Sequence, residues 1–322
     1  MIVSFAGSPD RVEATLVPEA GYEFDSFPIS GLPRQPGPAL LASLLRAAAA
    51  PRACRGILRR RRADVVFGAG GYVAGPMVLA AGSMRIPAAL AESDAQFGLA
   101  NRLALPFARR VFLAYPLPGR SGGRYRLVGR PIPARARAIP RLEAREIFEL
   151  PREGPVLLVA GALAGARSLN ELAIEAFGEV GPAVLHISGA RDYPVLRQRL
   201  RREDYRLLPA TDRIGAAYSA ADLILARAGG SVWEIAAAGR PAILVPYPFA
   251  TGDHQAKNAA HFVRAGGAIM IRELALADVP DRVRSLLGDR ARLGRMGEAM
   301  RAAARPDAAE EIAEGLVALA AT

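Results

Sequence analysis

Residues 222–246 read DLILARAGGSVWEIAAAGRPAILVP. Apolar runs open and close this stretch, at 222–226 and 242–246, and between them a glycine pair precedes a short helical pattern that ends at Gly239. This order predicts a strand, a turn, a helix and a second, parallel strand. Because parallel sheets bind ligands where such turns leave the carboxyl end of a strand, the stretch predicts a doubly wound α/β domain with a ligand site at the glycine pair.

The same alternation of apolar runs and helical patterns extends over nearly the whole chain. It predicts six strands in each half, and helices alone from Asp278 onward. The predicted strands are 2–6, 23–29, 64–68, 88–92, 111–115, 125–128, 155–160, 183–188, 205–209, 222–226, 242–246 and 268–271. We therefore expect an α/β protein with two Rossmann-like, doubly wound domains facing a cleft.

Proline and arginine are frequent between the two series of strands. Four prolines fall within residues 129–151, a composition typical of a linker between domains. We expect an N-terminal domain over residues 1–135, a linker over 136–152 and a C-terminal domain over 153–300. Residues 301–322 are expected to form a helix that packs back on the N-terminal domain.

Charge and cysteine content exclude several classes of protein. The net charge is +11, but Lys257 is the only lysine among 42 basic residues, so the arginine excess indicates a genomic codon bias more than a function. No zinc-finger spacing or aromatic RNA-binding motif accompanies the charge, and we expect no nucleic-acid partner. The single cysteine, Cys54, excludes a disulfide framework and indicates a reducing compartment, and no apolar run is long enough to span a membrane.

Two further glycine-rich turns follow predicted strands. Gly70 and Gly71 come after the third predicted strand, and Gly161 and Gly165 come after the seventh. Glycine lets backbone amides approach a ligand closely, and the helix that follows each turn favours an anion. Both turns are also explained as tight connections without a ligand, so both interpretations stay open.

The turn Arg227–Glu234 carries the strongest ligand signal. The amides of Gly229, Gly230 and Ser231 converge where an anion would bind, and the two oxygens of Glu234 suit the vicinal hydroxyls of a ribose. Ser231 and Glu234 also have the spacing of a capping box, in which each side chain satisfies a backbone donor. The sequence leaves both interpretations open.

A polar cluster follows the strand at 242–246. Asp253, His254, Gln255 and Asn258 combine donors and acceptors at a helix start, as sugar hydroxyls require, although Asp253 also suits a plain helix cap. The three histidines are not spaced as metal ligands, and no metal-binding motif is present. We therefore expect no metal and no cofactor, and expect helix N-termini to stabilise a departing diphosphate.

Several of these segments, in this order, resemble the MurG family of peptidoglycan N-acetylglucosaminyltransferases, which have the glycosyltransferase-B fold. The similarity extends over nearly the whole chain and is carried by residues 70–76, 98–102, 227–239 and 253–259. It implies an inverting, metal-independent enzyme that transfers N-acetylglucosamine from UDP-N-acetylglucosamine to an undecaprenyl-linked muramyl-pentapeptide. It also implies a peripheral position on the cytoplasmic face of the cell membrane.

The resemblance implies roles for individual residues. Glu234 would hold the ribose, Ile214 would lie near the uracil, and the diphosphate would lie on the turn after Arg227. The implied donor-binding residues are Gly161, Gly165, Ile214, Arg227, Gly229, Gly230, Ser231, Glu234, Asp253, His254, Gln255 and Asn258. The implied acceptor-binding residues are Gly70, Gly71, Tyr72 and Asn101. Glu92, with Asp94 as the alternative, would deprotonate the attacking hydroxyl.

The chain also departs from the family pattern. It lacks the family's first strand and the glycine-rich loop that ends in histidine, so we expect a gene start assigned about one βα unit too late, and two strands with unpaired edges. The family's Asn-Pro-x-Arg reads Arg130-Pro131-Ile132-Pro133 here, and its Gly-Gly-Ser reads Gly161-Ala162-Leu163. We therefore expect the donor site to be more intact than the acceptor site.

Two questions stay open at this level. The predicted helix 38–62 combines leucines with the arginines Arg59–Arg62, which suits an anionic membrane surface but also an ordinary solvated helix end. Other functions also fit parts of the pattern. These are a related lipid glycosyltransferase, and a UDP-sugar-binding remnant without full activity, which the missing first loop favours.

Overall fold

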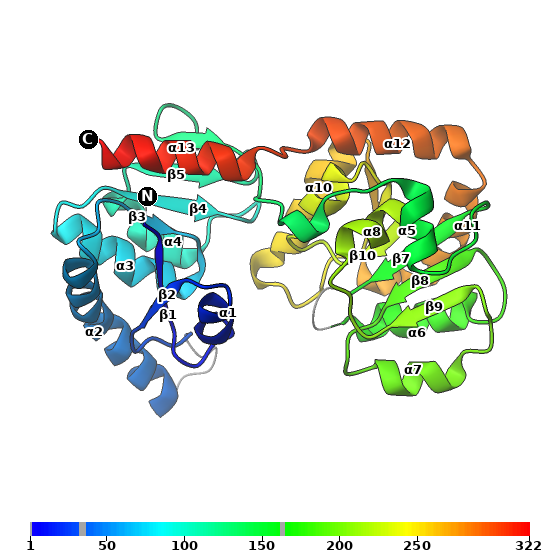
Figure 1. Ribbon diagram of the computed structural model, residues 1–322, viewed down its shortest axis with the longest axis horizontal. Helices are drawn as coiled ribbons and strands as arrows, with labels where there is room; N and C mark the ends of the chain where they lie inside the picture. The colour runs from blue at the N-terminus through cyan, green and yellow to red at the C-terminus, as the bar shows by residue number, and fades with distance from the viewer. Residues whose placement is uncertain (1, 32–36, 162–164) are drawn as a thin grey trace. The chain divides into compact units, whose positions relative to one another are not determined.

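The computed structural model describes residues 2–31, 37–161 and 165–322, which form two compact units (Figure 1). Unit 1 comprises Met1–Val128 and Glu310–Thr322, and unit 2 comprises Gly129–Ala309. Each of the twelve predicted strands is found in the described residues, with ends shifted by at most three residues. Within these ranges, no helix combines the length and the apolar character that crossing a membrane would require.

The sheet of unit 2 is doubly wound. Its strands are all parallel and have the order β12-β11-β10-β7-β8-β9. Their bounds are β7 (Val156–Ala160), β8 (Ala183–Ile187), β9 (Tyr205–Leu208), β10 (Leu223–Ala226), β11 (Ala242–Leu244) and β12 (Ala268–Met270). The chain builds outward from β7 in one direction and from β10 in the other, so the strand order reverses between β7 and β10.

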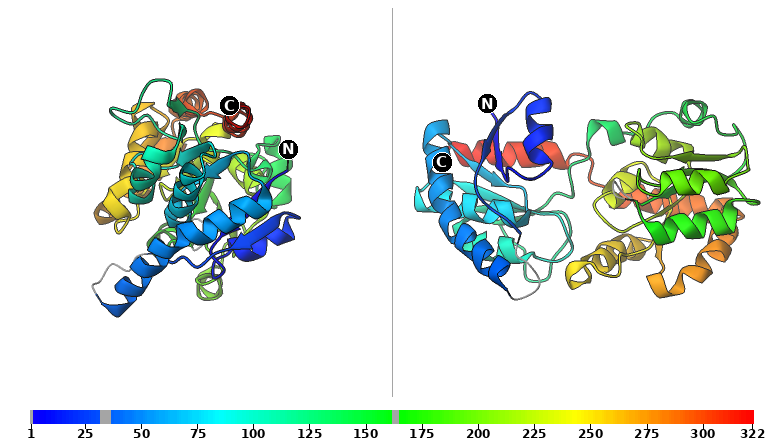
Figure 2. Two further views of the ribbon diagram at one scale, coloured as in Figure 1. Left: turned by 90° about the vertical axis from the view of Figure 1, so that its left-hand side faces the viewer. Right: turned by 90° about the horizontal axis from the view of Figure 1, so that it is seen from below.

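Helices cover this sheet because the strands are apolar on both faces. α6 and α7 lie along one face, where Leu169 and Phe177 of α6 pack in the same core cluster as Leu157 and Val159 of β7 (Figures 1 and 2). The helices of unit 2 are α5 (Arg141–Ile147), α6 (Arg167–Phe177), α7 (Tyr193–Arg199), α8 (Ile214–Ala220), α9 (Val232–Ala237), α10 (His254–Arg264), α11 (Val279–Leu287) and α12 (Arg290–Ala303).

Unit 1 contains two parallel sheets. β1 (Ser4–Gly7) pairs with β2 (Glu23–Ser26), and a second sheet has the order β3-β4-β5-β6. The strands of the second sheet are β3 (Val66–Gly68), β4 (Ala88–Glu92), β5 (Arg110–Leu113) and β6 (Tyr125–Leu127). Among the described residues β1 pairs only with β2 and β3 only with β4, so each of these strands keeps one unpaired edge, as the sequence predicts.

Helices pack on both faces of the four-stranded sheet of unit 1. They are α2 (Pro38–Arg61), α3 (Gly71–Ser83), α4 (Leu99–Ala104) and the last helix, α13 (Ala308–Ala320), whereas α1 (Glu13–Glu19) packs against β1 and β2. Along β5, Val111 and Leu113 point into the core beneath α2 and α3, whereas Phe112 points to the opposite face. There Phe112 shares a cluster with Ile312 and Leu319 of α13, which lies along that face (Figures 1 and 2).

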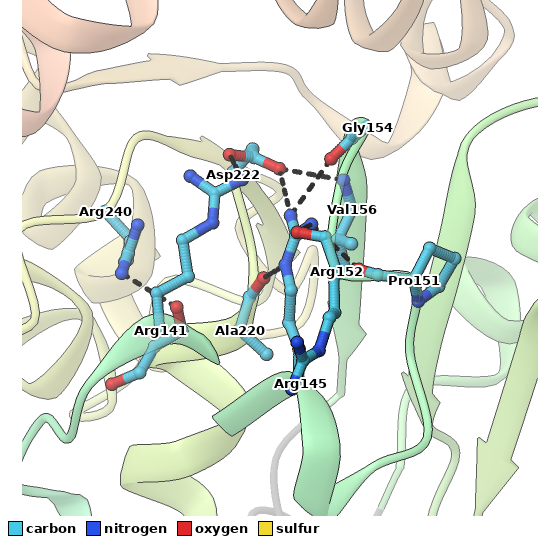
Figure 3. A network of polar contacts seen from close by, with 10 residues as sticks. Arg141, Arg145, Pro151, Arg152, Gly154, Val156, Ala220, Asp222 and Arg240 are labelled. Carbon is cyan, nitrogen blue, oxygen red and sulfur yellow. Dashed lines mark hydrogen bonds and ion pairs between the residues drawn. The ribbon is translucent and has the colours of Figure 1, made fainter. Parts of the chain in front are cut away.

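Residues 136–152, for which the sequence predicts a linker, belong to unit 2 and are held there by a buried arginine. The guanidinium of Arg145 on α5 is fully buried and forms an ion pair with Asp222 at 2.9 Å (Figure 3). It also donates hydrogen bonds to the carbonyl oxygens of Pro151, Arg152, Gly154 and Ala220. Burial lowers the pKa of Arg145, and the ion pair with Asp222 opposes that shift. These contacts join the segment to the start of the sheet, so it forms part of a domain.

Candidate functional site

A cavity of about 1260 Å³ lies in unit 2, where the carboxyl ends of its parallel strands meet. It includes the turns after β7 and β10, between which the strand order reverses, and doubly wound sheets bind ligands at such a point. Nine of the twelve predicted donor-binding residues line it: Gly161, Gly165, Ile214, Arg227, Gly229, Gly230, Ser231, Glu234 and Gln255. The cavity is therefore the candidate donor site.

The turn after β7 has glycine at both ends for steric reasons. Gly165 has a φ of +72°, a left-handed conformation that favours glycine. A Cβ atom on Gly161 would lie 2.7 Å from the Cβ of Ala166, at the start of α6. Residues 162–164, which include part of the predicted Gly161-Ala162-Leu163 departure, lie outside the described residues. Both glycines line the cavity.

Glu234 lies at the cavity wall and forms no capping box. Ser231 occupies the N-cap position of α9, but its side chain accepts no capping hydrogen bond. The Oε2 atom of Glu234 instead accepts a hydrogen bond from the hydroxyl of Tyr218, at 2.9 Å. Burial, followed by the charge of Glu234, raises the pKa of Tyr218, so this hydroxyl remains a donor at neutral pH. The capping interpretation is therefore not realised, and Tyr218 orients the carboxylate.

Arg227 is a buried arginine in the same cavity. Its guanidinium forms an ion pair with Glu273 and donates a hydrogen bond to Ser168 at 2.8 Å. Burial by itself would raise the pKa of Glu273, but the hydrogen bonds from Arg227 and Ser168 outweigh it and lower that pKa. The guanidinium also lies 5.7 Å from the ring centroid of Tyr247. Sequence reasoning missed these partners because they come from distant parts of the chain.

The predicted sugar-binding cluster is divided by the structure. Gln255 lines the cavity and accepts a hydrogen bond from the amide of Tyr247 at 2.8 Å, which leaves its Nε2 atom beside Gly229. The carboxylate of Asp253 pairs with Arg272, at 2.9 Å and 3.0 Å, and does not cap α10. His254 and Asn258 bond to backbone carbonyl oxygens, of Thr251 and Ala228, and neither is among the described residues that line the cavity.

His186 is a core residue of unit 2. Its two ring nitrogens lie 2.8 Å from the hydroxyl of Tyr205 and 2.9 Å from the side-chain oxygen of Asn170. Burial lowers the pKa of His186 to about 3, so the ring is neutral at physiological pH. In the described part of the chain, no group of three or more His, Cys, Asp or Glu residues is placed to hold a metal ion.

The predicted acceptor-binding residues lie in unit 1, at the carboxyl ends of β3 and β4. Gly70 and Gly71 have φ values of +106° and +72°, so glycine is required for the turn between β3 and α3. Tyr72 follows on α3, and its hydroxyl accepts a hydrogen bond from Arg11 at 3.1 Å. Asn101 on α4 is buried and donates to the carbonyl oxygen of Ala91 at 2.9 Å.

Glu92 ends β4 and organises the loop that follows it. Its Oε2 atom accepts hydrogen bonds from the amide of Gly98 at 2.8 Å and from Asn101 at 2.9 Å. Its Oε1 atom accepts one from the amide of Asp94 at 3.2 Å, and the residue is 6% exposed. A general base must offer a lone pair to the substrate, and here three donors already engage the two oxygens. This geometry favours an orienting role for Glu92.

Comparisons with known proteins identify the family of this chain. The N-terminal domain model of glycosyltransferase family 28 matches residues 1–113, and its C-terminal domain model matches residues 156–312. A Rubrobacter xylanophilus protein is 39% identical over 321 residues, which cover 98% of this chain and 95% of that protein. It is named UDP-N-acetylglucosamine–N-acetylmuramyl-(pentapeptide) pyrophosphoryl-undecaprenol N-acetylglucosamine transferase. The chain belongs to the MurG family.

A solved structure of the same family supports this assignment. The crystal structure of Acinetobacter baumannii MurG has a TM-score of 0.76 and 26% sequence identity, covering 98% of this chain and 90% of that chain. A UDP-N-acetylglucosamine 2-epimerase structure has a TM-score of 0.57 but only 15% identity, which shows a shared fold alone. The chain is thus a MurG-family hexosyltransferase with the glycosyltransferase-B fold.

Proposed function

We propose that the chain transfers N-acetylglucosamine from UDP-N-acetylglucosamine to undecaprenyl-linked N-acetylmuramyl-pentapeptide, by an inverting mechanism that needs no metal ion. Relatives with 33% to 39% identity over almost the whole chain carry this reaction in their names. The donor binds in the cavity of unit 2, and the acceptor binds unit 1 at Gly70, Gly71, Tyr72 and Asn101. Only the sugar is transferred, so the products are UDP and the glycosylated lipid.

The donor is divided among the turns that line the cavity. Ile214, at the start of α8, contacts the uracil, and the carboxylate of Glu234 binds the ribose hydroxyls. The amides of Gly229, Gly230 and Ser231 bind the diphosphate. The Nε2 atom of Gln255 donates to the sugar, since its other side-chain atom is engaged by Tyr247. Asp253 and Asn258 do not line the cavity, and they stabilise this end of the site through their contacts with Arg272 and with the carbonyl oxygen of Ala228.

The observation that carries this proposal is the carboxylate of Glu234, which Tyr218 holds at the cavity wall in a position that capping does not explain. A hydrogen bond to a charged group contributes about 1.5–3 kcal/mol, so E234A should weaken UDP binding about 10- to 100-fold. Tyr218 also lines the cavity, so water can replace the lost acceptor of its hydroxyl, and the free energy of unfolding should change by less than about 1 kcal/mol. Calorimetry and urea unfolding would measure the two effects, with the exposed Glu175 of α6 giving the control variant E175A.

Two results would count against this assignment. A loss of stability in E234A without a loss of UDP affinity would return Glu234 to a structural role. Equal affinity of the protein for UDP-glucose and UDP-N-acetylglucosamine would contradict the proposed donor sugar.

In the transfer step, the acceptor oxygen attacks C1 of the sugar from the side opposite the diphosphate, and a carboxylate accepts its proton. Glu92 and Asp94 are the predicted candidates. Because the oxygens of Glu92 already accept three hydrogen bonds, we propose that Glu92 positions the loop and that Asp94 accepts the proton.

We also propose that unit 1 associates peripherally with anionic membranes at the cytoplasmic face. Leu41 and Leu45 on α2 are 61% and 63% exposed, one helical turn apart. The basic end of α2 should contribute less to membrane binding than the sequence suggests, because Arg60 and Arg61 form ion pairs with Asp25. Apolar insertion should therefore matter more than charge.

Sedimentation with vesicles tests this proposal. The double variant L41D/L45D should lose most of its binding to vesicles that contain phosphatidylglycerol, while its affinity for UDP stays unchanged. Unchanged sedimentation of this variant would contradict the role of α2.

A further inference from the structure

Arginine side chains surround the donor cavity, and most of them already have an acidic partner. Those that line it are Arg130, Arg135, Arg167, Arg191 and Arg227. Arg227 pairs with Glu273, and Arg191 and Arg167 reach the carboxylate of Asp192 at 2.7 Å and 3.8 Å. Arg130 and Arg135 form no hydrogen bond or ion pair with any residue that the structure describes.

Arg130 differs from Arg135 by its contact with the turn that starts α9. A Cβ atom added to Gly230 would overlap the guanidinium of Arg130, with the Nε atom only 2.8 Å away. Gly230 is not among the glycines with positive φ, so its backbone conformation does not itself require glycine. A side chain at Gly230 would therefore have to displace the guanidinium of Arg130. The turn and the arginine therefore fit one another.

We propose that Arg130 binds the donor diphosphate and stabilises the departing UDP. This inference rests on the proposed function, which puts the diphosphate on the turn Gly229–Ser231. A guanidinium can donate two parallel hydrogen bonds to the oxygens of a phosphate, and that of Arg130 lies against this turn. With no carboxylate partner among the described residues, its natural counter-ion is a bound anion.

The charge of Arg130 has its largest effect when the bond between the sugar and the diphosphate breaks. The bond between C1 of the sugar and the β-phosphate oxygen breaks, and its electron pair stays on that oxygen. The acceptor oxygen bonds to C1 and loses its proton to the carboxylate of the proposed function. UDP thereby gains one negative charge, which the guanidinium of Arg130 offsets, so this contact is stronger after bond cleavage than before it.

Arg130 reaches the cavity from outside the set of strand-end turns. It lies in the segment before β7, in the Arg130-Pro131-Ile132-Pro133 stretch that departs from the family's Asn-Pro-x-Arg pattern. The pattern has its arginine where this chain has Pro133. The structure thus assigns the role to a residue that alignment with the pattern does not indicate.

Calorimetry with UDP and with uridine tests this inference on the full chain. R130A should bind UDP about 10- to 100-fold more weakly and bind uridine as the wild type does, because only UDP carries the phosphates. R130K keeps the charge but not the fork, and should recover part of the loss. R137A is the control, because Arg137 is an exposed arginine of the same segment and does not line the cavity.

The contact with Gly230 provides a second test. G230A should displace the guanidinium and weaken UDP binding to a similar extent. The double variant R130A/G230A should then be no worse than either single variant, since both changes remove one interaction. With UDP-N-acetylglucosamine as substrate, kcat of R130A should fall more than its KM rises.

The outcomes separate this inference from the proposed function. Equal losses for UDP and uridine in R130A would overturn it, because they would indicate a general change in the cavity. Unchanged UDP affinity in R130A would overturn it while leaving the proposed function intact. Wild-type protein that binds neither molecule would overturn both.

Discussion

Replacing Arg145 by methionine should destabilise unit 2 strongly. The guanidinium donates five hydrogen bonds, one of them to Asp222 at 2.9 Å, and the side chain is fully buried (Figure 3). R145M retains the volume but leaves every one of those acceptors without its donor. Breaking a buried ion pair by removing one partner costs about 3–5 kcal/mol.

The surroundings of Asp222 put the expected value near the lower end of that range. Its carboxylate keeps a hydrogen bond from the amide of Val156 at 2.9 Å and an ion pair with Arg141 at 2.7 Å. Its side chain is also 17% exposed, so water reaches the remaining charge. We therefore expect R145M to lower the free energy of unfolding by about 3 kcal/mol.

Trp233 provides the assay, because it is the only tryptophan of the chain and is buried in unit 2. Urea unfolding followed by its fluorescence reports on this unit. R141M is the matched control: Arg141 pairs with the same carboxylate but is 43% exposed, so its removal should cost about 1 kcal/mol or less. A loss below about 1 kcal/mol in R145M, or equal losses in both variants, would refute the reasoning.

Two further predictions concern pH and catalysis. The pKa of His186 is about 3 in the folded protein, whereas an unfolded histidine has a pKa of about 6.5, so only the unfolded chain takes up this proton as pH falls from 7 to 5. His186 should therefore cost about 2 kcal/mol of stability over that interval, and H186Q should lose this part of the pH dependence in urea unfolding; an unchanged dependence would contradict the assignment. D94N should lower kcat at least about 100-fold with little effect on stability, whereas E92Q should lower both; the opposite pattern in kinetics and thermal melting would make Glu92 the base.

Local sequence order was sufficient to predict most of the fold and most of the residues that line the candidate donor cavity. The strands were predictable because each is a short apolar run between turn residues, and the glycine turns were predictable because they follow strands. Parallel topology then brings the carboxyl ends of those strands together, so Gly161, Gly229 and Gln255 line one cavity although they are far apart in the chain.

Side-chain partners were not predictable in this way. The contact between Tyr218 and Glu234 and the ion pair between Arg227 and Glu273 depend on how helices pack on the sheet. One signal for the position of Tyr218 was available. Tyr218 lies four residues after Ile214, a predicted donor-binding residue, on the same helix, so the two side chains share a face. The ion pair between Asp253 and Arg272 could not be predicted from the residues around Asp253. The carboxylate of Asp253 is engaged by this pair and does not line the cavity.

Pairing also determines what each arginine contributes to the donor site. The charge of Arg227 is offset by Glu273, whose lowered pKa keeps the pair ionised at neutral pH, so the pair produces a weak field at the cavity. A phosphate that recruited Arg227 would also have to compete with this carboxylate. Arg130 has no such competitor among the described residues, so its full charge acts on a bound anion. The net charge of +11 therefore indicates little about the donor site, whereas the pairing of individual arginines indicates which one a departing diphosphate meets.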